Sequence, residues 1–131
     1  MTTYATDAQV SEWDSSAKDF LPASDSASFA RLRQRAYEEI GRRLLRREPA
    51  VLQADLGLVA ELTHAEVLFV VHRLYADAAA KVGDDGTLKW RSEQALAAFV
   101  DEMENIRIPA ADDTTGTQYV QSVVTVPIWR R

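Results

Sequence analysis

Hydrophobic residues recur with a helical period through most of the chain. Thr6 followed by Gln9 fits a capping box, which predicts a short helix through Val10 and Trp13 that stops before Pro22. A long second helix is predicted over about 26–47, where Pro49 ends it. Its inward stripe is expected at Phe29, Leu32, Ala36, Ile40 and Leu44.

A third and a fourth helix follow. The segment 52–82 is apolar on most sides, which predicts a helix that is buried on most sides. At that length it would span about 45 Å, so we expect another subunit to cover part of it. Gly83 suits a left-handed cap. Thr87 is expected to cap a fourth helix that runs to about Asn105, with Trp90 on the side opposite its apolar stripe of Leu88, Ala95, Leu96, Phe99 and Met103.

The last fifteen residues break this pattern, since TQYVQSVVTVPIWRR is rich in β-branched side chains. A lone strand is unstable in water, so the segment needs a partner. One possibility is a lopsided hairpin in which 105–108 pairs with part of 118–126. Even then the stretch from about Val124 to Trp129 lacks a partner in its own chain, which favours an arm that docks on another protein by strand addition.

These elements predict a mainly α protein. We expect a small helical bundle of about four helices, two of them long, in a body over 1–110, followed by a loop and extended C-terminal β-like arm over 111–131. The length of 131 residues and a hydrophobic content of 47% suit one domain. The chain has no cysteine, so disulfides and thiolate metal sites are excluded. No apolar run is long enough for a membrane span, and we expect a soluble protein.

The formal charge of −5 argues against a surface that binds nucleic acid as a whole, but the second helix carries a cluster of arginines. Arg31, Arg35, Arg42 and Arg46 fall on one side of it. They could form a phosphate-binding ridge or a solvated or intersubunit face. The second interpretation is favoured by three possible ion pairs at i,i+4 spacing, Arg35 with Glu39, Glu38 with Arg42, and Glu39 with Arg43. Arg33 differs, because it falls inside the apolar stripe and must reach a carboxylate, within the fold or on a neighbour.

Candidate chemistry is sparse. Glu61 and His64 form one Glu-x-x-His step, but a di-iron bundle needs a second such pair and further carboxylates. His64 and His72 stand eight residues apart, which does not suit a zinc helix. No phosphate-binding glycine loop, nucleophile motif or Ser-His-Asp order stands out. We therefore expect no enzyme activity, no metal and no cofactor.

The order of elements resembles the head-tail adaptor (connector, or head completion) proteins of tailed bacteriophages and phage-like particles. The similarity runs from about Thr6 to Pro109 and includes SFARLRQRAYEEIGRRLL, AEVLFVVHRLYADA and WRSEQALAAFVDEMENIRIPA, matched as loose apolar patterns. The resemblance implies a structural virion protein that forms a ring, expected to be twelve-fold, between the portal and a tail-side connector or stopper. It implies assembly in the host cytoplasm, with DNA only passing through the lumen.

The resemblance also implies where the partners bind. The C-terminal arm would engage the portal, and the exposed faces of the long helices would meet neighbouring subunits. The alternative is a small helical nucleic-acid-binding or regulatory module that uses the arginine-rich helix 31–47. The expected subunit interface comprises Arg31, Arg33, Arg35, Arg42, Arg46 and Trp90, and the expected portal-binding arm comprises Tyr119, Val120, Val123, Val124, Val126, Ile128, Trp129, Arg130 and Arg131.

Overall fold

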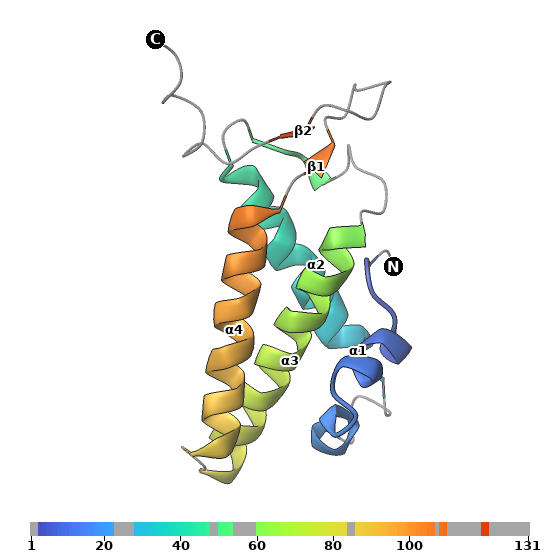
Figure 1. Ribbon diagram of the computed structural model, residues 1–131. Coiled ribbons are helices and arrows are strands. Elements are labelled where there is room, and N and C mark those ends of the chain that lie inside the picture. The colour runs from blue at the N-terminus through green and yellow to red at the C-terminus, as the bar shows by residue number, and fades with distance from the viewer. Residues whose placement is uncertain are drawn as a thin grey trace.

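The computed structural model is mainly α, as the pattern predicts, and its described part contains four α-helices (Figure 1). They are α1 (Asp7–Trp13), α2 (Ala30–Leu45), α3 (Ala60–Val82) and α4 (Thr87–Asn105), with a 3-10 turn η1 (Ala17–Phe20) and two short strands, β1 (Ile108–Pro109) and β2 (Tyr119–Val120). The structure describes residues 3–22, 28–47, 50–53, 60–83 and 86–106, and the backbone of the two strands.

Helix α3 is the centre of the bundle. It packs against α4 along one side and against α2 along another, while α1 and η1 contact it lower down. In Figure 1, α2 and α4 both rise toward the upper end of the molecule and α3 descends in front of α2. Two groups of buried side chains hold these helices together. Tyr75 and Phe29 belong to the group beside α1, whereas Phe99, Ile40 and Met103 belong to the group at the upper end.

The start of α1 is built as predicted. Thr6 Oγ1 accepts a hydrogen bond from the Gln9 amide at 3.3 Å, and Gln9 Oε1 accepts one from the Thr6 amide at 2.9 Å. Both partners of the capping box are therefore present. The helix ends at Trp13, where the Asp14 amide still donates to the Val10 carbonyl.

The apolar stripe of α2 is confirmed, but its ends differ from the prediction. Phe29, Leu32, Ala36, Ile40 and Leu44 are all buried. The helix begins at Ala30, and residues 23–27, where the start at 26 was expected, lie outside the described residues. It ends at Leu45 rather than 47. Because the Leu44 carbonyl accepts the Val51 amide at 3.0 Å, the chain turns back over the last turn of the helix.

The prediction of a third helix starting at 52 is wrong at that end. Leu52 is not helical, and Gln53 Nε2 donates to the Tyr37 carbonyl, which holds this segment against α2. Residues 54–59 lie outside the described residues, and α3 begins at Ala60. Its 23 residues span about 34 Å at 1.5 Å per residue, and α2 and α4 cover it within the same chain. Helix length therefore gives no reason to invoke a second subunit. Gly83 has the predicted left-handed φ of 72°.

Helix α4 runs to Asn105 as predicted, but Thr87 does not cap it. The N-cap is Gly86, with no side-chain cap hydrogen bond, and Thr87 is the first helical residue. After α4 the chain forms the hairpin, in which Ile108 pairs with Val120 and Pro109 with Tyr119 in an antiparallel ladder. The predicted strand at 105–108 starts too early, since Asn105 is still helical. Residues 121–131 lie outside the described residues.

None of the described helices has the length and apolar character required to cross a lipid bilayer.

Candidate interaction surfaces

The two histidines have structural contacts. His64 Nδ1 lies 3.4 Å from Glu102 Oε1, and its ring meets the Trp13 ring edge-on with centroids 4.9 Å apart. His72 Nδ1 lies 3.0 Å from Ser92 Oγ, and burial lowers the pKa of His72. The described residues contain no group of three or more His, Asp or Glu side chains placed to hold a metal ion.

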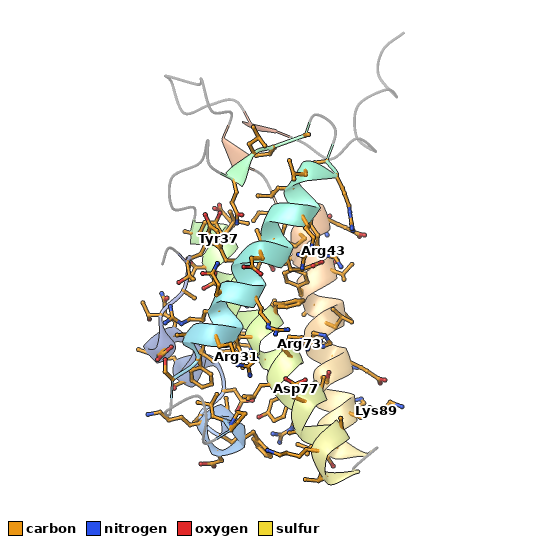
Figure 2. The ribbon with its side chains drawn as sticks, turned by 180° about the vertical axis from the view of Figure 1, so that it is seen from behind. Arg31, Tyr37, Arg43, Arg73, Asp77 and Lys89 are labelled. Carbon is orange, nitrogen blue, oxygen red and sulfur yellow. The ribbon has the colours of Figure 1, made fainter. Side chains whose placement is uncertain are left out.

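The arginines predicted to share one side of α2 do so. Arg31, Arg35, Arg42 and Arg46 are all exposed, and Glu38 lies among them on the same line. Figure 2 views α2 from outside, with Arg31 near its lower end and Arg43 near its upper end. We call this set the α2 stripe: Arg31, Arg35, Glu38, Arg42, Leu45 and Arg46.

Of the three ion pairs predicted on α2, the one between Glu39 and Arg43 is confirmed. Glu39 binds both Arg42, at 2.8 Å, and Arg43, at 3.0 Å. The pairs expected from Arg35 to Glu39 and from Glu38 to Arg42 are not formed. In the described part of the chain, no carboxylate forms an ion pair with Arg35 or Arg46. Glu39 forms ion pairs with two guanidinium groups at once. The α2 stripe, with four arginines and one glutamate, therefore keeps an excess of positive charge.

A polar hollow adjoins the α2 stripe on the side of α3. Its volume is about 490 Å³. Arg73 enters it from α3, where its guanidinium lies 3.6 Å from Asp77, and Figure 2 places it beside α2. The guanidinium groups make the hollow attractive to carboxylates or phosphates. It is lined by Arg35, Glu38, Glu39, Arg42, Phe69 and Arg73.

Arg33 finds its carboxylate within its own chain. Its Nε lies 2.9 Å from Asp7 Oδ1, and its Nη1 donates to Thr3 Oγ1 at 2.9 Å and to the Ala5 carbonyl at 2.8 Å. Its side chain is only 16% exposed. The prediction that this position needs a carboxylate is confirmed, but Arg33 does not belong to a surface available to a neighbour. Its charge fixes the N-terminal segment to α2.

Glu66 completes this attachment and was not anticipated from the sequence. Its fully buried carboxylate accepts the Tyr4 amide at 3.0 Å and the Ala5 amide at 2.8 Å. Thr63 Oγ1 donates to the Tyr4 carbonyl at 2.9 Å, so the backbone of this segment is bonded to α3 as well as to α2. Burial raises the pKa of Glu66, although the two amides and the charge of Arg33 oppose that rise. The available signal was an acidic residue inside the apolar run of α3.

The outward line of α4 differs in character from that of α2. Trp90 is 60% exposed, as predicted, and Gln94, Ala97, Asp101 and Glu104 follow it at helical spacing. Every one of these side chains is exposed, whereas Ser92, Ala95, Phe99 and Met103 are buried on the other side of the helix. We call Trp90, Gln94, Ala97, Asp101 and Glu104 the α4 stripe.

An apolar groove separates the α4 stripe from α1. Its volume is about 280 Å³, its walls carry Trp13 and Trp90, and Leu68, Val71 and Tyr75 of α3 lie between them. Trp13 is 55% exposed. The two tryptophans therefore present aromatic surface beside the α4 stripe, whose far end is acidic, a combination typical of protein interfaces.

A hydrogen-bonded cluster lies at one end of this groove. The Tyr75 hydroxyl donates to Asp14 Oδ2 at 2.5 Å, and Arg91 Nη1 donates to the Tyr75 hydroxyl at 3.3 Å. Burial alone would raise the pKa of Asp14, but the hydrogen bonds from Tyr75 and Ser16 outweigh it and hold the pKa below its ordinary value. Burial and the bond to Asp14 raise the pKa of Tyr75. These groups satisfy one another and anchor α1 to α3.

The surface positions predicted from the sequence thus fall into three groups. Arg31, Arg35, Arg42, Arg46 and Trp90 are exposed on the body. Arg33 is internal. Of the arm, only the backbone of Tyr119 and Val120 is described, as strand β2, whereas Val123, Val124, Val126, Ile128, Trp129, Arg130 and Arg131 lie outside the described residues.

Comparisons of this chain with protein-family models, with curated proteins and with solved structures yielded no match in any of the three.

Proposed function

We propose that this protein is a structural subunit of a phage or phage-like particle, a head-tail adaptor that assembles as a ring and docks on the portal through its C-terminal arm. The proposal starts from the resemblance of the chain to that family. One observation of the fold carries it further: a firmly packed helical body exposes a basic stripe on α2 and an aromatic and acidic stripe on α4. A subunit that repeats head to tail needs two different surfaces of this kind.

The exit of the chain from the body supports an arm that acts on another protein. Ile106 is 5% exposed, and its carbonyl accepts a hydrogen bond from Arg47 Nη2 at 2.8 Å. The end of α4 is therefore fixed before the β1–β2 hairpin begins. In Figure 1 this hairpin lies beyond the upper ends of α2 and α4. An arm that continues from there would leave the bundle at one pole, where a portal ring could receive it by strand addition.

Deleting residues 119–131 is expected to leave a folded helical body that no longer binds the portal. The deletion removes the β-branched and aromatic side chains that would dock, whereas both described buried clusters lie within residues 4–106. Co-sedimentation with the portal protein encoded in the same genome measures binding, and circular dichroism measures folding. Val124→Asp with Val126→Asp should also lose binding while keeping the full chain length.

The matched control is Lys18→Ala, on η1 in the lower part of the bundle and away from the hairpin (Figure 1), which should bind the portal like the parent protein. Undiminished portal binding by the deletion and by the double variant would contradict the proposed role of the arm. If the body unfolds without residues 119–131, the arm belongs to the core of its own chain, and that result would also overturn the proposal.

The alternative function, binding of nucleic acid by the arginine-rich helix 31–47, makes a different prediction. Replacing Arg31, Arg35, Arg42 and Arg46 together by glutamine would then abolish salt-sensitive DNA binding, because several phosphate contacts would be lost. We expect instead that the unmodified protein has little DNA affinity, since Glu38 and Glu39 lie among the arginines. Fluorescence anisotropy with duplex DNA over a range of salt concentrations distinguishes the adaptor function from the nucleic-acid-binding function. Tight, salt-dependent binding that the four substitutions remove would favour the alternative.

A further inference from the structure

The α2 stripe and the α4 stripe have the same residue spacing. Each position of the α2 stripe has a counterpart on α4 that is 59 residues later in the chain. Arg31 corresponds to Trp90, Arg42 to Asp101 and Leu45 to Glu104. Both stripes therefore extend about 20 Å along their helices with side chains at matching heights. The remaining correspondences are Arg35 with Gln94, Glu38 with Ala97, and Arg46 with Asn105.

The chemistry is complementary at two of the six corresponding positions. A guanidinium at Arg42 would meet the carboxylate of Asp101, and Arg31 would lie over the exposed ring of Trp90, a favourable cation–π arrangement. Arg46, whose direct counterpart is Asn105, would come within reach of the adjacent Glu104. In the middle, Glu38 would face Ala97, whose small side chain lets two helix axes approach to about 8 Å.

These two stripes cannot meet within one molecule. Each stripe lies on the side of its helix opposite the buried residues, and Figure 1 has α4 in front whereas Figure 2, seen from behind, has α2 in front. Contact between them requires a second copy, and the contact is heterologous, since different surfaces of the two copies meet. The directions are compatible: α2 and α4 both rise in Figure 1, with α2 inclined to α4, so a copy that is tilted as well as rotated relative to its neighbour presents its α2 parallel to the neighbouring α4.

We infer that the α4 stripe is the docking surface for the α2 stripe of a second copy of this chain, with the helices parallel and Arg42 opposite Asp101. This inference rests on the proposed ring assembly and specifies its subunit contact. It makes the polar hollow beside α2 part of that contact, because Arg42, which lines the hollow, would face Asp101 at the acidic end of the neighbouring α4. The Trp13–Trp90 groove lies at the edge of the same interface and is covered as the copies approach.

Disulfide trapping tests the arrangement, because the chain contains no cysteine of its own. Glu38→Cys combined with Ala97→Cys in the full chain places the thiols opposite each other in the inferred contact. Mild oxidation with diamide should yield a ladder of covalent dimers, trimers and larger species on non-reducing gels, both free at high concentration and on portal rings. Either single variant can form dimers at most.

An off-register pair provides the matched control. Arg46→Cys with Ala97→Cys carries the same number of thiols, but position 46 lies about 12 Å along the helix from position 38. At least a tenfold weaker ladder is expected from it. A Glu38/Ala97 ladder no stronger than this control, with and without portal rings, would overturn the inference. Portal binding without the ladder would leave the adaptor function standing, whereas the ladder without portal binding would keep the self-docking surface and overturn the portal proposal.

Discussion

Replacing Glu66 by alanine is expected to lower the free energy of unfolding by about 3 kcal/mol. The side chain is fully buried and accepts the amides of Tyr4 and Ala5. Without it, both amides remain buried without an acceptor, and each such loss costs about 1 to 3 kcal/mol. Urea unfolding followed by circular dichroism measures the change. Replacement of the exposed Glu12 by alanine is the control and should change stability by less than about 0.5 kcal/mol.

Glu66→Gln separates the loss of acceptors from the loss of volume. Glutamine has nearly the same shape but only one oxygen, and its amide group would face one of the two backbone N–H groups. We expect a loss of about 1 to 2 kcal/mol at neutral pH, smaller than the loss for alanine. Equal stability of the parent, Glu66→Gln and Glu66→Ala would contradict the assigned role in holding the N-terminal segment.

The parent protein and Glu66→Gln should also differ in pH dependence. Burial raises the pKa of Glu66 above its ordinary value of 4.5, so between these two values the folded state holds a proton that the unfolded state has released. The stability that this proton contributes is fully present below pH 4.5 and is lost as pH rises through the folded-state pKa. The advantage of the parent over Glu66→Gln should therefore be greatest in mild acid. A stability difference between the parent and Glu66→Gln that grows steadily toward neutral pH would contradict this pH dependence.

The sequence predicts the faces of the helices better than their ends. Phe29, Ile40 and Leu44 are buried as the helical period requires, because burial follows from spacing alone. The segment at 50–53, where the pattern predicts the start of α3, is held by a tertiary hydrogen bond instead, since Gln53 donates to the Tyr37 carbonyl on α2. A period in the sequence contains no information about such a bond.

For the polar contacts, too, the sequence predicts one part and not the other. The position of Arg33 inside an apolar stripe requires a carboxylate, but nothing local indicates that Asp7, twenty-six residues away, supplies it. Glu66 is harder still, because its partners are backbone amides, and every residue except proline has one. Surface composition is easier to predict, since the exposed positions of α2 and Trp90 follow directly from the helical period.

Reversing one charge of the inferred contact is expected to block self-docking. Asp101→Arg places its guanidinium opposite that of Arg42 in the neighbouring copy. Arg42→Glu places its carboxylate opposite that of Asp101 in the neighbouring copy. The difference between an attractive and a repulsive pair is about 1 to 2 kcal/mol at a partly exposed interface, enough to slow ladder formation by the Glu38→Cys, Ala97→Cys protein about tenfold. Glu12→Arg makes the same charge change as Asp101→Arg, but on α1, and should leave the rate unchanged.

Combining Asp101→Arg with Arg42→Glu should restore ladder formation, because the exchanged charges again attract. The two single variants should also cross-link with each other when mixed, since the introduced carboxylate of one copy meets the introduced guanidinium of the other. Loss of Arg42 removes one ion pair with Glu39, an exposed contact worth less than about 1 kcal/mol, so folding is retained and circular dichroism can verify it. If the combined variant cross-links as slowly as the single ones, Arg42 and Asp101 do not face each other, and the parallel arrangement of α2 and α4 fails with them.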